Sequence, residues 1–327
     1  MRNFEKKISR VLSGPWGAGA LILTAVIFYC AWMLSGQTPA PYTPASLVDG
    51  ASGIHIASPG SSATVNLLVI AAVGFLLWML NRWYFITHST SRIYIGLYAL
   101  GVAVVPSLCT GLNSGTVMCA VLVYCVMLLY TLYQRPNGTR RVFFVFCMLS
   151  AGTIFDYAYV GYALPMILAC GQMRCMSLRT ILAAAIGLAV PVWIGWGFDL
   201  FSLDALRAPA ITFPSAALLS AWPVALRILI PGAAIFTIVL TLVNTVTIYG
   251  HNAKTRANNG VLALLSLWTA IAPAFDFAHA ASYLPVMLTM LALQTALCLS
   301  LRSNRSGYLA VAACILLYLA CGIWLLF

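Results

Sequence analysis

Two aspartates, Asp156 and Asp276, stand in matching surroundings and are the residues best suited to do chemistry. The segments share a pattern, Phe155-Asp156-Tyr157-Ala158-Tyr159 before Leu164-Pro165 and Phe275-Asp276-Phe277-Ala278-His279 before Leu284-Pro285. Five of the eleven aligned positions are identical without a gap. Each Asp lies between two apolar runs, so each segment is predicted to be a helical hairpin with a carboxylate at its turn.

Two interpretations of these carboxylates stay open. Each Asp can act as the N-cap of the helix that follows, where it would accept hydrogen bonds from exposed backbone N–H groups. Alternatively, both face one cavity and form a shared site, because ionisable groups at membrane depth are costly and mark substrate or ion paths. The second interpretation makes Asp156 and Asp276 candidate catalytic residues.

His279 follows Asp276 by three residues, so the two side chains would share a helix face, and the carboxylate could orient the imidazole for proton transfer. A buried, hydrogen-bonded histidine is the alternative. The equivalent residue of the first hairpin is Tyr159, so a symmetric metal site is not expected. Tyr157 and Tyr159 belong to an aromatic group that forms either an interfacial belt or a platform for stacking a sugar.

Three further charged residues are candidates because they are expected on the outer side of a membrane. Asp49 is the only acid of a proline-rich loop and is a candidate general base. Arg207 and Arg227 oppose the charge bias of the chain, and a guanidinium can bind a phosphate with two hydrogen bonds. Alternatively, Arg227 reaches the headgroups from an interfacial helix as an anchor.

The composition identifies the solvent in which these residues must be positioned. Of the 327 residues, 62% are apolar and only 7% are charged, against about 25% charged residues in a soluble protein. So few ionised side chains cannot cover a water-exposed surface. The chain is therefore predicted to be an all-α, polytopic membrane protein, with membrane lipids around it.

The positions of the cations predict how the chain crosses the membrane. Fifteen of the 17 Lys and Arg residues cluster in short segments between apolar runs. The positive-inside rule places these segments in the cytoplasm, with the N-terminus. The net charge of +11 is thus a topology signal, and no nucleic-acid partner is expected.

Apolar runs long enough to span a membrane lie at 17–35, 65–83, 93–112, 115–133, 180–198, 229–249 and 307–327. Cations at both ends of 142–172 and of 260–301 require each stretch to cross an even number of times. The first is so short that it must form two short helices or a re-entrant hairpin. About eleven transmembrane or half-membrane helices are therefore expected in one domain, residues 1–327, with the C-terminus outside, outer loops at 36–64 and 199–228, and a possible pseudo-repeat of the two hairpins.

No cofactor or metal site is expected. The ten cysteines are scattered and include no pair at metal-binding spacing. A phosphate-binding glycine loop, a zinc-binding HExxH motif and a nucleophile elbow are absent from the sequence.

The stretch from Arg174 through Arg179-Thr180 to Gly187-Leu188-Ala189-Val190-Pro191 resembles a poorly characterised family of polytopic inner-membrane proteins from Bacteroidetes-type bacteria. The resemblance implies a bacterial inner-membrane location and no activity. The architecture is also similar to that of GT-C membrane glycosyltransferases, except that Ser35-Gly36-Gln37-Thr38 follows the first helix where those enzymes carry acids. This similarity implies a transferase acting on a polyprenyl-phosphate-linked sugar at the outer face. A transporter or flippase, and a subunit that assembles with other envelope proteins, are the alternatives.

Overall fold

The computed structural model describes residues 14–35, 59–87, 92–135, 137–199, 212–215, 222–302 and 305–326. Asp49 and Arg207 lie outside the described residues. Within these ranges all regular secondary structure is helical, apart from one isolated β-bridge between Thr212 and Asp276. The predicted all-α class is confirmed.

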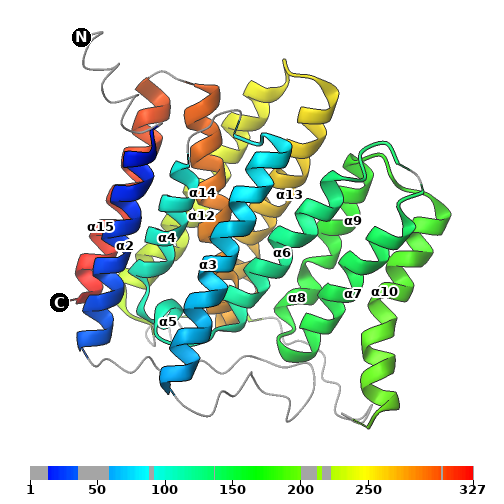
Figure 1. Cartoon of the computed structure of the whole chain (residues 1–327), viewed down its shortest axis with the longest axis horizontal. Coiled ribbons are helices and arrows are strands. Elements are labelled where there is room, and N and C mark those ends of the chain that lie inside the picture. Colours follow the sequence, from blue (N-terminus) through cyan, green and yellow to red (C-terminus); the bar gives the residue numbers. More distant parts are fainter. Residues whose placement is uncertain are drawn as a thin grey trace.

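The helices run roughly parallel or antiparallel to one another (Figure 1). In chain order they are α2 (Pro15–Ser35), α3 (Pro59–Tyr84), α4 (Ile93–Val104), α5 (Pro106–Cys109), α6 (Ser114–Tyr130), α7 (Thr139–Phe155), α8 (Ala158–Gly161), α9 (Ala163–Gln172), α10 (Leu178–Gly197), α12 (Val224–Ile248), α13 (Ala253–Phe275), the 3₁₀ turn η2 (Phe277–His279), α14 (Ala280–Leu301) and α15 (Arg305–Leu326).

Seven of the described helices are long and apolar enough to cross a membrane, namely α2, α3, α10, α12, α13, α14 and α15. The chain is therefore a multi-pass membrane protein, as its composition predicts. The expected total of about eleven segments adds the shorter α4, α6, α7 and α9, and stays a prediction.

Several predicted boundaries differ from the observed ones for local reasons. The run at 93–112 is divided at Pro106, which has no N–H to continue the helix and begins α5 instead. The loop predicted at 36–64 ends earlier, because α3 begins at Pro59, a residue suited to the first helical position. The second loop also ends before residue 228, since α12 begins at Val224.

Helix α14 lies at the centre of the bundle and packs against α4, α6, α12, α13 and α15. Its most apolar window is 89% buried, whereas the corresponding windows of α2 and α10 are 28% buried. A helix that is apolar on all sides is suited to such an enclosed position. Helix α10 lies at the edge and packs chiefly on α7, where Gly187 faces the Phe143 carbonyl and leaves no room for a Cβ.

The bundle has two chemically different ends. At the upper end in Figure 1, helices α6, α9 and α12 finish and α4, α7, α10 and α13 begin. Most described cations lie at this end, which we name the arginine end: Arg82, Arg92, Arg135, Arg140, Arg141, Arg174, Arg179, Lys254, Arg256 and Arg302. The described carboxylates, Asp156, Asp199 and Asp276, lie at the opposite end, which we name the hairpin-turn end.

Candidate functional site

Both hairpins of the sequence repeat turn at their aspartate. Asp156 follows α7 and Asp276 follows α13, and each backbone N–H donates to the carbonyl four residues earlier, at 2.9 and 3.0 Å. Asp156 ends α7 in extended conformation, with φ −149° and ψ 117°, whereas Asp276 ends α13 with φ −135° and ψ 69°. The aspartates are thus the C-caps of α7 and α13. The expected N-cap role is wrong for Asp156, because the N-cap of α8 is Tyr157, although Asp156 Oδ1 accepts from the Ala158 N–H. Asp276 is the N-cap of η2, but its side chain makes no capping hydrogen bond there.

The Asp156 carboxylate is fully enclosed, with 0% of the residue exposed. Its Oδ2 accepts hydrogen bonds from the Ser114 hydroxyl at 2.5 Å and the Ser282 hydroxyl at 2.8 Å. Its Oδ1 accepts from the Ala158 N–H at 3.0 Å. Buried carboxylates need such donors, and here three elements supply them, so Asp156 ties α6, the first hairpin and α14 together.

Asp276 has a different set of partners. Its Oδ1 accepts from the His279 Nδ1 at 2.8 Å and from the Thr212 hydroxyl at 3.1 Å. Its Oδ2 accepts from the Tyr157 hydroxyl at 2.8 Å and, more weakly, from the Tyr283 hydroxyl at 3.5 Å. The expected contact between Asp276 and His279 is therefore present.

The two hairpins exchange these hydrogen bonds crosswise. Ser282 of the second hairpin donates to Asp156 of the first, while Tyr157 of the first donates to Asp276 of the second. The Tyr157 hydroxyl also contacts His279 Nδ1. The two aspartates consequently belong to one polar cluster, in which Asp156 is surrounded by hydroxyls and Asp276 by an imidazole and phenols.

The hydrogen bonds determine the electrostatics at Asp276. Burial raises the pKa of its carboxyl, but hydrogen bonds from His279, Tyr157 and Thr212 outweigh that effect and hold the pKa below its ordinary value. Burial, followed by the hydrogen bond to Asp276, raises the pKa of the Tyr157 phenol. At neutral pH the cluster therefore contains an ionised Asp276 and a protonated Tyr157.

The hydrogen bond to Asp276 assigns the tautomer of a neutral His279. Since a carboxylate only accepts, Nδ1 carries the proton and Nε2 keeps its lone pair, an assignment made from the network. The imidazole side chain is 21% exposed and the Asp276 side chain 11%. A partly exposed histidine oriented by a buried carboxylate is suited to accept a proton from a bound molecule.

A loop segment and the start of α12 cover one side of this cluster. The Thr212 carbonyl accepts from the Phe277 N–H at 2.9 Å, and the Trp222 and Phe277 rings lie 5.6 Å apart. Arg227 Nε donates to the Trp222 carbonyl at 2.8 Å. Arg227 thus lies at the hairpin-turn end near the cluster, but in the first turn of α12, so the interfacial helix expected there is wrong for residues 224–228.

The aromatic residues of the hairpins are buried, so the expected interfacial belt is wrong. At most 8% of any of these residues is exposed, namely Tyr157, Tyr159, Tyr162, Phe277 and Tyr283. Tyr159 packs where Gly152 leaves space, since a Cβ there would lie 2.2 Å from its ring. Of this group, Tyr157 and Tyr283 contact Asp276 through their hydroxyls, whereas the Tyr159 hydroxyl donates to the Ser114 carbonyl at 3.5 Å.

Sequence reasoning missed Ser114, Ser282 and Thr212, because isolated hydroxyl residues in apolar or loop segments have no distinguishing spacing. In the described ranges, no group of three His, Cys, Asp or Glu side chains is arranged to hold a metal ion. Comparisons with protein families, curated proteins and solved structures give no match to this chain.

Proposed function

We propose that the protein is a membrane-embedded transferase that acts on a lipid-linked sugar at the hairpin-turn end, with His279 as the general base. This proposal rests on the 2.8 Å hydrogen bond between His279 and Asp276, whose side chains are both partly exposed. A carboxylate-oriented imidazole is a common arrangement for removing a proton from an attacking hydroxyl.

In the proposed reaction, His279 Nε2 removes the proton from a hydroxyl group of the acceptor. The oxygen of that hydroxyl attacks the anomeric carbon of the donor sugar, and the bond between this carbon and the polyprenyl phosphate oxygen breaks. The leaving phosphate takes the bonding electron pair and gains negative charge. Arg227, held through the Trp222 carbonyl, supplies a nearby cation to offset that charge.

The membrane orientation supports an outer-face reaction. Described cations collect at the arginine end, and the positive-inside rule assigns that end to the cytoplasm. The hairpin-turn end would then face outward. If the protein lies in the inner membrane of a bacterium, this is the side on which polyprenyl-linked sugars are used. Polyprenyl-phosphate-linked sugars are accordingly the proposed substrate class.

A proton-coupled transporter is the second candidate, because the same cluster could also conduct protons. The Asp276, His279 and Tyr157 side chains form a connected set of groups able to pass a proton. Asp156, however, is enclosed by three donors and 0% exposed. A transport path lined by both carboxylates is therefore less well supported than a reaction at His279.

Purified full-length protein in liposomes distinguishes these candidates. Radiolabelled polyprenyl-phosphate hexoses, supplied with an extract of envelope lipids as acceptor, should give labelled glycolipid product and free polyprenyl phosphate. Liposomes containing a trapped pH indicator test the alternative in the same preparation. Sugar transfer without proton flux supports the transferase, whereas proton flux driven by a solute gradient without sugar transfer contradicts it.

A further inference from the structure

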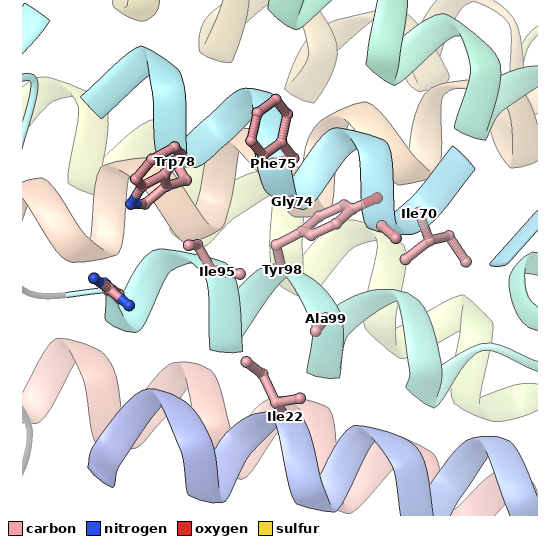
Figure 2. A pocket seen from close by; sticks show the side chains of 10 residues that line it. Ile22, Ile70, Gly74, Phe75, Trp78, Ile95, Tyr98 and Ala99 are labelled. Atoms are coloured by element: carbon pink, nitrogen blue, oxygen red, sulfur yellow. The ribbon is translucent and has the colours of Figure 1, made fainter. Parts of the chain in front are cut away.

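A groove at the arginine end lies apart from the polar cluster, between α2, α3 and α4 (Figure 2). It has a volume of about 420 Å³, within the usual range of about 300–1,000 Å³ for small-molecule sites. Its lining is mainly apolar and includes Ile70, Gly74 and Trp78 of α3 and Ile95 and Tyr98 of α4, with Arg92 as its charged member.

The length of the groove corresponds to one leaflet of a bilayer. Its wall on α3 extends from Trp78 at the arginine end to Ile70 near the middle of the helix. Eight residues of helix rise about 12 Å, close to half of the roughly 30 Å hydrocarbon thickness. The groove is therefore long enough to hold a large part of one lipid acyl chain.

The charged end of the groove is suited to an anion. Arg92 lines it, and the Arg82 guanidinium lies over the Trp78 ring at 5.0 Å from the ring centre. All described carboxylates lie at the hairpin-turn end, so no described acid neutralises these two cations. Arginine binds phosphate through paired hydrogen bonds.

A second observation within the groove also indicates a ligand. Tyr98 is 1% exposed, and its hydroxyl has no hydrogen-bond partner in the described part of the chain. Figure 2 shows its ring extending from α4 toward Gly74 and Ile70 of α3. A buried hydroxyl without a partner is costly, and this one belongs to a residue that lines the groove.

We infer that this groove binds an anionic phospholipid, with its phosphate at Arg92 and Arg82 and one acyl chain along α3 and α4. The inference does not depend on the proposed transferase activity. The lipid would fill the space between α2 and α3, which the bundle itself leaves open.

Native mass spectrometry of the detergent-solubilised full chain, titrated separately with dioleoyl phosphatidylglycerol and dioleoyl phosphatidylcholine, tests this inference. We expect tighter binding of phosphatidylglycerol, and a loss of about five-fold in its affinity for Arg92→Gln, since one juxtamembrane cation contributes about 1 kcal/mol toward anionic lipid. Arg140→Gln is the matched control, because Arg140 is, like Arg92, an exposed arginine of the arginine end, but it does not line the groove.

A side chain that fills the groove tests whether a lipid acyl chain lies along α3 and α4. A Cβ at Gly74 would meet Ile95 at an ordinary 3.7 Å, so Gly74→Leu places its extra atoms in the groove without a backbone clash. Gly19→Leu adds the same side chain where nothing lies within 4 Å. Loss of phosphatidylglycerol binding in Gly74→Leu but not in Gly19→Leu is expected. Equal affinity for the two lipids, or equal effects of a variant and its control, would overturn the inference.

Discussion

Individual residues divide the polar cluster into a structural part and a reactive part. Asp156 receives hydrogen bonds from Ser114, Ser282 and Ala158, and none of these donors is a group that ordinarily transfers protons at neutral pH. Asp276 is bonded to His279, whose imidazole is partly exposed. The same residue type in two similar sequence segments therefore has two roles, set by its partners.

Replacing Asp156 with Asn should destabilise the protein. The substitution replaces one carboxyl oxygen with an NH₂ group, which cannot accept a hydrogen bond, and leaving a buried donor without its partner costs about 1–3 kcal/mol. We expect a lower thermal unfolding midpoint in detergent, with Asp199→Asn as the control, because Asp199 is exposed at the end of α10. Equal midpoints for the two variants would show that the Asp156 hydrogen bonds add little stability.

The lowered pKa of Asp276 predicts a pH-dependent contribution to stability. Because the folded-state pKa lies below the ordinary value of 3.8, the ionised carboxylate stabilises the fold, fully above that value. The contribution is lost as the pH falls through the folded-state pKa. Unfolding midpoints of wild type and Asp276→Asn should therefore differ at pH 6 and converge in strong acid. A difference that is unchanged down to the lowest accessible pH would contradict this assignment.

At the scale of elements, the position of the cluster depends on how closely α6 approaches α14. Gly115 faces the start of α14, where a Cβ would lie 2.5 Å from the Ser282 carbonyl oxygen. That approach brings both Ser114 and Ser282 to Asp156. Small residues commonly allow such contacts between membrane helices.

Gly115→Ala should consequently force α6 and α14 apart and weaken both serine hydrogen bonds to Asp156. We expect a clear decrease in the thermal unfolding midpoint. Gly171→Ala, at a position with nothing within 4 Å of the added Cβ, is the control and should leave the midpoint unchanged. If Gly115→Ala is as stable as this control, the close approach is not required.

The elements also show what a sequence can predict here. Long apolar runs and flanking cations give the helices and hairpins, because the bilayer imposes length and polarity on each segment. The Asp276–His279 contact follows from local spacing. The donors to Asp156 come from Ser114 and Ser282, 42 and 126 residues away in sequence, and only the packing of α6 on α14 brings them together. Burial of Tyr159 and Tyr162 likewise depends on neighbouring helices, so the aromatic pattern alone did not predict it.

At the scale of the whole molecule, the segregation of charge predicts its orientation. Most described cations lie at one end of the bundle and the described carboxylates at the other, so the hairpin-turn end should face outward. The proposed site is accessible to an outer-face substrate only in this orientation.

Labelling with a membrane-impermeant maleimide in intact cells measures this orientation. In a background with exposed Cys30 replaced by Ala, Phe213→Cys should react in intact cells. Asn137→Cys and His251→Cys should react only after the cells are permeabilised. The reverse pattern would place the arginine end outside and remove the basis for an outer-face reaction.

If His279 performs the proton transfer, replacing it with Gln should remove the reaction without unfolding the protein. Rates of polyprenyl phosphate release from the labelled donor are measured for wild type, His279→Gln and His251→Gln, with thermal midpoints recorded for each. His251 is the matched control, since it is exposed at the arginine end after α12. We predict a loss of about 10²–10⁴-fold for His279→Gln, the usual contribution of a general base, and an unchanged rate for His251→Gln. A folded His279→Gln variant that releases polyprenyl phosphate at the wild-type rate would contradict the claim.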